Sequence, residues 1–81
     1  MVEIKILGIG CPRCNELERL CFNVAAEHNI DADIQKITDL EQIMAYGVMQ
    51  TPALVINGKV KISGKLPTSS TLLHWIEEEN K

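Results

Sequence analysis

The chain begins with a short stretch in which apolar and charged side chains alternate. Val2, Ile4 and Ile6 fall on one side of an extended chain, with charged residues between them. A period of two is typical of a half-buried strand, so the pattern predicts a strand over Val2–Leu7. Gly8-Ile9-Gly10 follows and ends the strand, because glycine gives the backbone the freedom to turn.

The next stretch changes to helical spacing. Pro12 suits the first turn of a helix, where its missing N–H is not needed. From there side chains recur three or four residues apart on one face, with charged residues outside that face. We therefore predict a helix from about Pro12 to His28. The side chains on this face are Leu17, Leu20, Cys21, Val24, Ala25 and His28, and we read His28 as a surface or rim histidine.

A second strand and a short helix are predicted in the middle of the chain. Ala32–Ile37 reads as a short strand. Thr38 follows, with Glu41 three residues later, which is the capping-box pattern that begins a helix. We predict a short helix over Asp39–Tyr46, ended by Gly47, because glycine readily adopts the left-handed conformation found after helices.

The last third of the chain predicts a hairpin and a helix. Ala53–Ile56 and Lys59–Ile62 are apolar runs separated by Asn57-Gly58, and Asn-Gly between such runs is a strong hairpin signal. Thr68 or Ser69 can then cap a final helix. Its inner stripe is Leu72, Trp75, Ile76 and Glu79, and we read the run Glu77-Glu78-Glu79 as a solvated helix end.

The predicted order is β-α-β-α-β-β-α. Strands joined through a helix are expected to be parallel with a right-handed crossover, whereas the hairpin strands are antiparallel. The expected fold is α/β, a mixed four-stranded sheet with three flanking helices. We expect residues 1–81 to form a single domain of this kind.

Composition narrows the possible functions. The 81 residues are 46% hydrophobic, and the formal net charge is −3. We do not expect the protein to bind nucleic acid, because phosphate binding requires clustered Lys and Arg. No stretch reaches the roughly 18 apolar residues of a membrane span, so we expect no membrane insertion. The first residues lack the pattern of a signal peptide, which predicts a cytoplasmic protein.

The candidate chemistry is in the Cys11-Pro12-Arg13-Cys14 stretch at the start of the first helix. In a reducing compartment, two close cysteines are more often catalytic or metal-binding than a structural staple. Cys11 faces the unpaired N–H groups and the positive end of the helix dipole, and Arg13 adds a positive charge. Both effects lower a thiol pKa and favour the attacking thiolate. Cys11 is therefore the predicted nucleophile, and Cys14 is the predicted resolving thiol.

Two other functions fit a lone CxxC. Cys11 and Cys14 could hold a soft metal such as Cu(I) or zinc, as in a metallochaperone. That reading is disfavoured by the element order, since ferredoxin-like metallochaperones follow βαββαβ. The domain could instead be a noncatalytic binding module with incidental thiols. Cys21, seven residues after Cys14, is read as a small apolar core residue.

Two separate stretches together resemble the thioredoxin superfamily. The first is the strand, turn and Cys11–Cys14 motif, and the second is the segment Tyr46–Val60 with Thr51-Pro52 before a strand. The chain is most similar to small glutaredoxin-like "redox-active disulfide" proteins. The resemblance implies a thioredoxin-like fold and a cis bond before Pro52. It also implies that Thr51-Pro52 lies against the cysteines and that the Thr51 backbone pairs with an extended partner.

The same resemblance implies a thiol–disulfide oxidoreductase without cofactor or metal. Pro12 and Arg13 are expected to activate the thiols, and Gly10, Thr51 and Pro52 to bind substrate. The expected partners are disulfide-containing proteins and a reductase, and the expected state is a monomer. Ser63–Pro67 only faintly matches the glutathione-binding segment of glutaredoxins, so glutathione dependence is left open.

Overall fold

The structure, a computed structural model, describes residues 2–9 and 12–79. Its elements follow the order predicted from the sequence, which confirms the expected fold class. In chain order they are β1 (Val2–Leu7), α1 (Pro12–Glu27), β2 (Ala32–Ile37), α2 (Leu40–Ala45), β3 (Ala53–Ile56), β4 (Lys59–Ser63) and α3 (Ser69–Glu79). Within these described ranges, none of the helices combines the length and the apolar character that crossing a bilayer requires.

The four strands form one mixed sheet in the order β2-β1-β3-β4. β1 and β2 pair in parallel, and the connection between them runs through α1. β3 is antiparallel to both β1 and β4, and the β3–β4 pairing shifts register between Leu54 and Val55. The two central strands therefore carry the buried apolar residues, while β2 and β4 form the edges.

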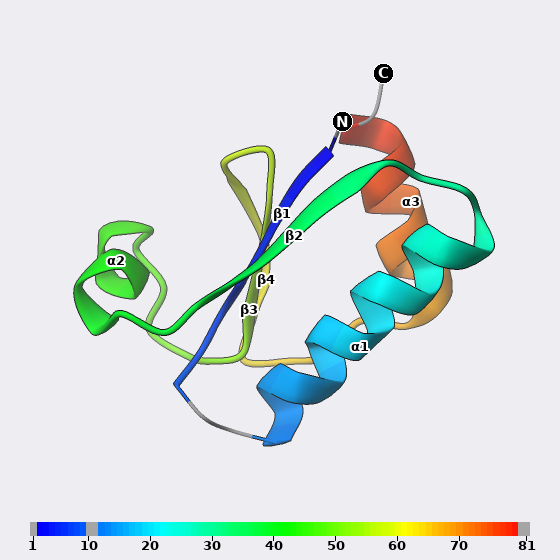
Figure 1. The fold of residues 1–81 in the computed structure, drawn as a ribbon. Helices are drawn as coiled ribbons and strands as arrows, with labels where there is room; N and C mark the ends of the chain where they lie inside the picture. The colour runs from blue at the N-terminus through cyan, green and yellow to red at the C-terminus, as the bar shows by residue number, and fades with distance from the viewer. Residues whose placement is uncertain (1, 10–11, 80–81) are drawn as a thin grey trace.

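The helices cover the two faces of the sheet unequally. α1 and α3 lie side by side on one face, and α2 lies alone on the other, near one end of the strands (Figure 1). The face under α1 and α3 carries the larger core. It comprises Val2, Ile4, Ile6, Leu17, Cys21, Val24, Leu54, Ile56, Leu72 and Ile76. A smaller cluster under α2 comprises Leu7, Ile43, Val48, Ala53 and Val55.

One local prediction, the N-cap of α2, was wrong. α2 begins after Asp39, whose carboxylate accepts the Glu41 N–H at 3.0 Å, so the cap is Asp39 and not Thr38. Either residue has a side chain that can cap, and Asp39 is the one in the extended conformation before the first turn. α1 ends at Glu27, next to the predicted end at about His28, and the exposure of His28 confirms its interpretation as a surface histidine.

The run Glu77-Glu78-Glu79 is not simply a solvated helix end. The side chain of Glu79 is only 11% exposed, and its carboxylate lies 3.0 Å from Lys61 Nζ on β4. Neighbouring Lys59 reaches the same carboxylate at 3.3 Å. α3 is thereby tied to the hairpin at the end of the sheet farthest from Cys14.

Candidate active site

The site begins where β1 gives way to α1. α1 starts at Pro12, and Cys14 is the third residue of the helix, with no exposed surface. Pro12 and Arg13 are exposed beside it. Two further predicted site residues, Gly10 and Cys11, lie outside the described residues.

Gly8 packs directly against the Cys14 side chain. A Cβ placed on Gly8 would overlap the Cys14 sulfur and lie 3.2 Å from Cys14 Cβ. The Gly8 N–H donates to the Ile37 carbonyl at 3.0 Å, which holds this backbone in line with the sheet. Gly8 is therefore required by the close approach of a thiol, since any side chain would occupy the space of the sulfur. The sequence indicated only a turn at this glycine.

The Thr51-Pro52 segment lies on the other side of Gly8. The peptide bond between these two residues is cis, the isomer that the resemblance implied. The same Cβ position on Gly8 would lie 3.8 Å from Thr51 Cβ, so Thr51 lies near the glycine against which Cys14 packs. Cys14 and Thr51 are 37 positions apart in the sequence, yet both lie near Gly8.

A second loop holds the Thr51-Pro52 segment in place. The Gly64 N–H donates to the Pro52 carbonyl at 2.8 Å, and Gly64 has a positive φ of 75°. A side chain at Gly64 would also strike the side chain of Gln50. Pro52 is buried, whereas Thr51 is exposed. Among the described residues, no backbone hydrogen bond uses the main chain of Thr51.

Cys21 does not belong to this site. It is fully buried in the core under α1 and α3, two turns along the helix from Cys14. Burial, with the nearby charge of Glu18, raises the pKa of the Cys21 thiol to about 12. A thiol with so high a pKa is almost entirely protonated at neutral pH, so it is a poor nucleophile and metal ligand. The interpretation of Cys21 as a core residue is confirmed.

An apolar groove of about 380 Å³ opens beside Thr51. Its wall includes Ile9, which follows Gly8 at the end of β1, and Met49, which lies two residues before Thr51. These side chains are 57% and 96% exposed, respectively. The remaining lining comes from α2 and the loop after it: Leu40, Ile43, Met44 and Val48. The sequence analysis missed this groove, because apolar residues in a short helix read equally well as core.

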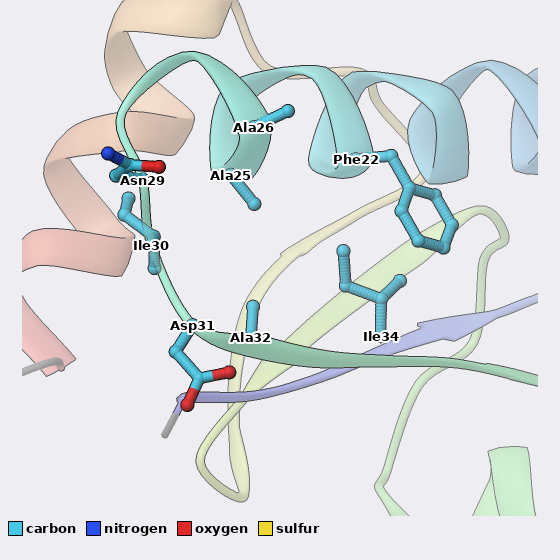
Figure 2. Close-up of a pocket in the computed structure, with 8 residues that line it drawn as sticks. All are labelled: Phe22, Ala25, Ala26, Asn29, Ile30, Asp31, Ala32 and Ile34. Atoms are coloured by element: carbon cyan, nitrogen blue, oxygen red, sulfur yellow. The ribbon is translucent and has the colours of Figure 1, made fainter.

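A second hollow, of about 400 Å³, has a lining that does not include Cys14 (Figure 2). It is formed by the C-terminal half of α1 and the start of β2. Phe22 stands over Ile34 there, while Asn29 and Asp31 supply polar groups at one end. Among residues 2–9 and 12–79, no group of three or more His, Cys, Asp or Glu side chains is placed to hold a metal ion.

Comparison with known proteins gives consistent matches over nearly all of the chain. The family model for the Thioredoxin domain matches residues 2–77. A protein named Thioredoxin from Methanocaldococcus jannaschii is 37% identical over 81 residues, which cover 100% of this chain and 88% of the relative. Another protein of that name, from Methanothermobacter thermautotrophicus, is 33% identical over 72 residues, covering 89% and 94% of the two chains.

Solved structures match the fold. A mutant thioredoxin from Halobacterium salinarum superposes with a TM-score of 0.77 at 25% identity, covering 99% of this chain and 75% of that one. Oxidised thioredoxin from Plasmodium falciparum superposes with a TM-score of 0.64 at 13% identity, covering 99% and 82%. The second likeness bears on the fold alone.

Proposed function

The chain belongs to the thioredoxin family, and we propose that it is a thiol–disulfide oxidoreductase in which Cys11 attacks and Cys14 resolves. Family membership supports the general role in thiol–disulfide exchange. The roles of the two cysteines, and the choice between thioredoxin-type and glutaredoxin-type partners, belong to the proposal.

The reaction is an exchange of one disulfide for another. The Cys11 thiolate attacks one sulfur of the target disulfide, forming a mixed disulfide and releasing the other target sulfur as a thiolate. The Cys14 thiolate then attacks the Cys11 sulfur, which forms the Cys11–Cys14 disulfide and releases the second target sulfur. Two electrons pass from the domain to the target, and a reductase returns them to the domain.

The observation that carries this proposal is the packing of Cys14 on the bare backbone of Gly8, next to Thr51. Cys14 thereby lies against the strand end from which the exposed Thr51 is also approached, a position suited to a thiol that takes part in exchange. A resolving thiol benefits from being shielded from solvent, because only a sulfur already attached to Cys11 is then within reach. Arg13, exposed one residue away, supplies positive charge on the outer side of the helix start, where a thiolate at Cys11 would gain from it.

Thr51 is suited to receive an extended segment of the target. Its side chain is exposed, and its main chain makes no backbone hydrogen bond among the described residues. A partner strand could therefore donate to and accept from this residue, the mode by which extended peptides add to exposed backbone. Pro52 and Gly64 would keep the segment rigid during that contact, and Gly10 would lie beside it.

We propose that the partners are protein disulfides and a reductase, and that the domain acts as a monomer in the cytoplasm. The element order disfavours a metal-carrying role. The element order ends in α3, unlike the βαββαβ order of ferredoxin-like metallochaperones.

The proposal is tested by insulin reduction with dithiothreitol as the electron donor. We expect turnover by the native protein and none by Cys11→Ser or Cys14→Ser, whereas Cys21→Ser keeps most of the activity if it folds. Folding of each variant is checked by circular dichroism. Full insulin reduction by Cys11→Ser would reject the proposed role of Cys11, whereas no insulin reduction by the native protein would favour a noncatalytic binding module.

A further inference from the structure

The groove beside Thr51 is lined by two methionines that the fold leaves exposed. Met49 is 96% exposed and Met44 is 64% exposed, while the core residues around them are buried. The chain has only three methionines, and Met1 lies outside the described residues. Both described methionines therefore line the same groove.

The groove is continuous with the candidate dithiol site. Thr51 lines the groove and also approaches Gly8, the residue on which Cys14 packs. Among the described residues that line it, none is charged and Thr51 alone is polar. We assign as its occupant an apolar side chain of the protein substrate, next to the disulfide that is reduced. Flexible, polarisable methionine side chains suit a surface that must accept different apolar groups.

We propose that Met44 and Met49 make this groove an oxidation-sensitive docking surface, so that their conversion to sulfoxides weakens the binding of protein disulfides and spares the dithiol chemistry. This inference rests on the proposed function. It adds a modification site and a form of regulation to that function.

The oxidant is hydrogen peroxide or an alkyl hydroperoxide. The methionine sulfur takes one oxygen atom from the peroxide, whose O–O bond breaks to leave water or an alcohol. The sulfur loses two electrons and the peroxide gains them, with no net change in protons. The product is a polar, chiral sulfoxide, which is poorly suited to an apolar contact and can be returned to methionine by methionine sulfoxide reductases.

Peroxide can reach the two methionines without oxidising the core cysteine. Met44 and Met49 are open to solvent, whereas Cys21 is fully buried and holds its proton because burial raises its pKa to about 12. Cys11 and Cys14 can be protected by first oxidising them to their disulfide. Dithiothreitol later restores the dithiol but does not reduce sulfoxides, so the methionine change can be studied alone.

The test treats the disulfide form of the full chain with hydrogen peroxide, then reduces it with dithiothreitol. Peptide mass mapping measures sulfoxide at each methionine. Reduction rates are measured with insulin and with a small aromatic disulfide that is too small to fill the groove. The matched control is the double variant Met44→Leu, Met49→Leu, which keeps apolar side chains of similar volume that peroxide does not oxidise.

We expect the kcat/KM for insulin to fall on the order of tenfold, the size of effect that loss of an apolar contact in a binding pocket commonly has. The rate with the small disulfide should stay unchanged, and the leucine variant should resist peroxide. Treatment with methionine sulfoxide reductases should restore insulin reduction.

Three results would overturn the inference. They are unchanged insulin reduction after both methionines are oxidised, an equal loss with the small disulfide, and equal sensitivity of the leucine variant. If the untreated protein reduces neither insulin nor the small disulfide, the proposed function is rejected, and this inference is rejected with it.

Discussion

The two ends of the sheet are built in opposite ways. At the end that carries the hairpin turn, polar groups are bonded to one another. Glu3 and Asn57 exchange two hydrogen bonds of 2.8 and 2.9 Å, and the Asn57 side chain donates to the Glu79 carbonyl at 3.0 Å. Lys61 reaches the Glu79 carboxylate at 3.0 Å. β1, the hairpin and α3 are thus fastened together at this end.

The end that carries Cys14 is left open. Thr51 presents a main chain without backbone hydrogen bonds among the described residues, and Met49 and Ile9 are exposed beside it. At this end the Cys14 side chain packs against Gly8, and the Gly64 N–H donates to the Pro52 carbonyl at 2.8 Å. The side-chain polar bonds that join β1, the hairpin and α3 thus lie at the end far from Cys14. The end that carries Cys14 leaves the Thr51 main chain and apolar side chains exposed, as the proposed contact with a partner requires.

The largest effect is expected from Gly8→Ala, at the open end. The new methyl group would occupy the space of the Cys14 sulfur, so Cys14 must move. Overpacking of this kind costs about 1–3 kcal/mol of stability. Displacing a reacting group by about 1 Å can cost about a hundredfold in rate. Urea unfolding and insulin reduction measure the two effects.

The double variant Gly8→Ala, Cys14→Ala isolates the cause of the Gly8→Ala effect. Removing the sulfur relieves the overlap, so adding Gly8→Ala should cost clearly less stability in a Cys14→Ala background than in the native one. Purely additive losses would show that Gly8 is needed for another reason.

Cys21→Ala is expected to change stability and not chemistry, because Cys21 lies in the core between the two ends. Loss of the buried sulfur should cost about 1–2 kcal/mol, with insulin reduction unchanged. In the native protein at pH 8, iodoacetamide should leave Cys21 unmodified until the chain unfolds, since the raised pKa of about 12 keeps the thiol protonated. Rapid alkylation of folded protein at Cys21 would contradict this account.

A smaller effect is expected from Asp39→Ala, which removes the N-cap of α2. The Asp39 carboxylate accepts the Glu41 N–H, and loss of such a cap typically costs about 1 kcal/mol. Thr38→Ala is the matched control and should change stability little. α2 carries Leu40 and Met44, so fraying of its first turn should also loosen the groove at the open end. Equal losses of stability in the two variants would contradict the assignment of Asp39, and not Thr38, as the N-cap.

The smallest effect is expected from Glu79→Gln, at the fastened end. The hydrogen bond from Lys61 lowers the pKa of the Glu79 carboxyl below its ordinary 4.5, helped by Lys59. A lowered folded-state pKa contributes stability above the unfolded value, and this contribution is lost as the pH falls through the folded value. Native protein should therefore exceed Glu79→Gln in melting temperature at pH 7, and the gap should close in acid.

Glu77→Gln is the control for the effect of charge alone. Glu77 is exposed in the same run of three glutamates and makes no ion pair among the described residues. Its substitution should leave the pH dependence of melting unchanged. Insulin reduction should be unaffected in both variants, because the fastened end lies far from Cys14. A loss of activity in Glu79→Gln would break the division between the two ends.

Much of the fold could be predicted from local patterns. The alternation in Val2–Leu7 and the Asn57-Gly58 turn each depend on residues close in sequence, and the structure confirms the elements that they predict. The boundary at Thr38 failed because two adjacent residues can both cap a helix. Only the backbone conformation at Asp39 decides between them.

The site was only partly predictable for a different reason. The contact between Gly8 and Cys14, and its approach to Thr51, join three segments that no periodicity connects. The role of Glu79 depends likewise on which strand α3 crosses. The resemblance to thioredoxins gave the proximity of Thr51-Pro52 to the cysteines, but it did not reveal the groove lined by Met44 and Met49. That groove follows from how this chain's own short helix packs.

The most direct test of the central claim is to trap the mixed disulfide. Cys14→Ser in its reduced form is mixed with a disulfide-containing protein, quenched with acid, and analysed by intact mass and peptide mapping. If Cys11 attacks and Cys14 resolves, this variant accumulates a covalent complex through Cys11, and Cys11→Ser accumulates none. A complex that forms through Cys14 in Cys11→Ser, with none in Cys14→Ser, would contradict the assignment.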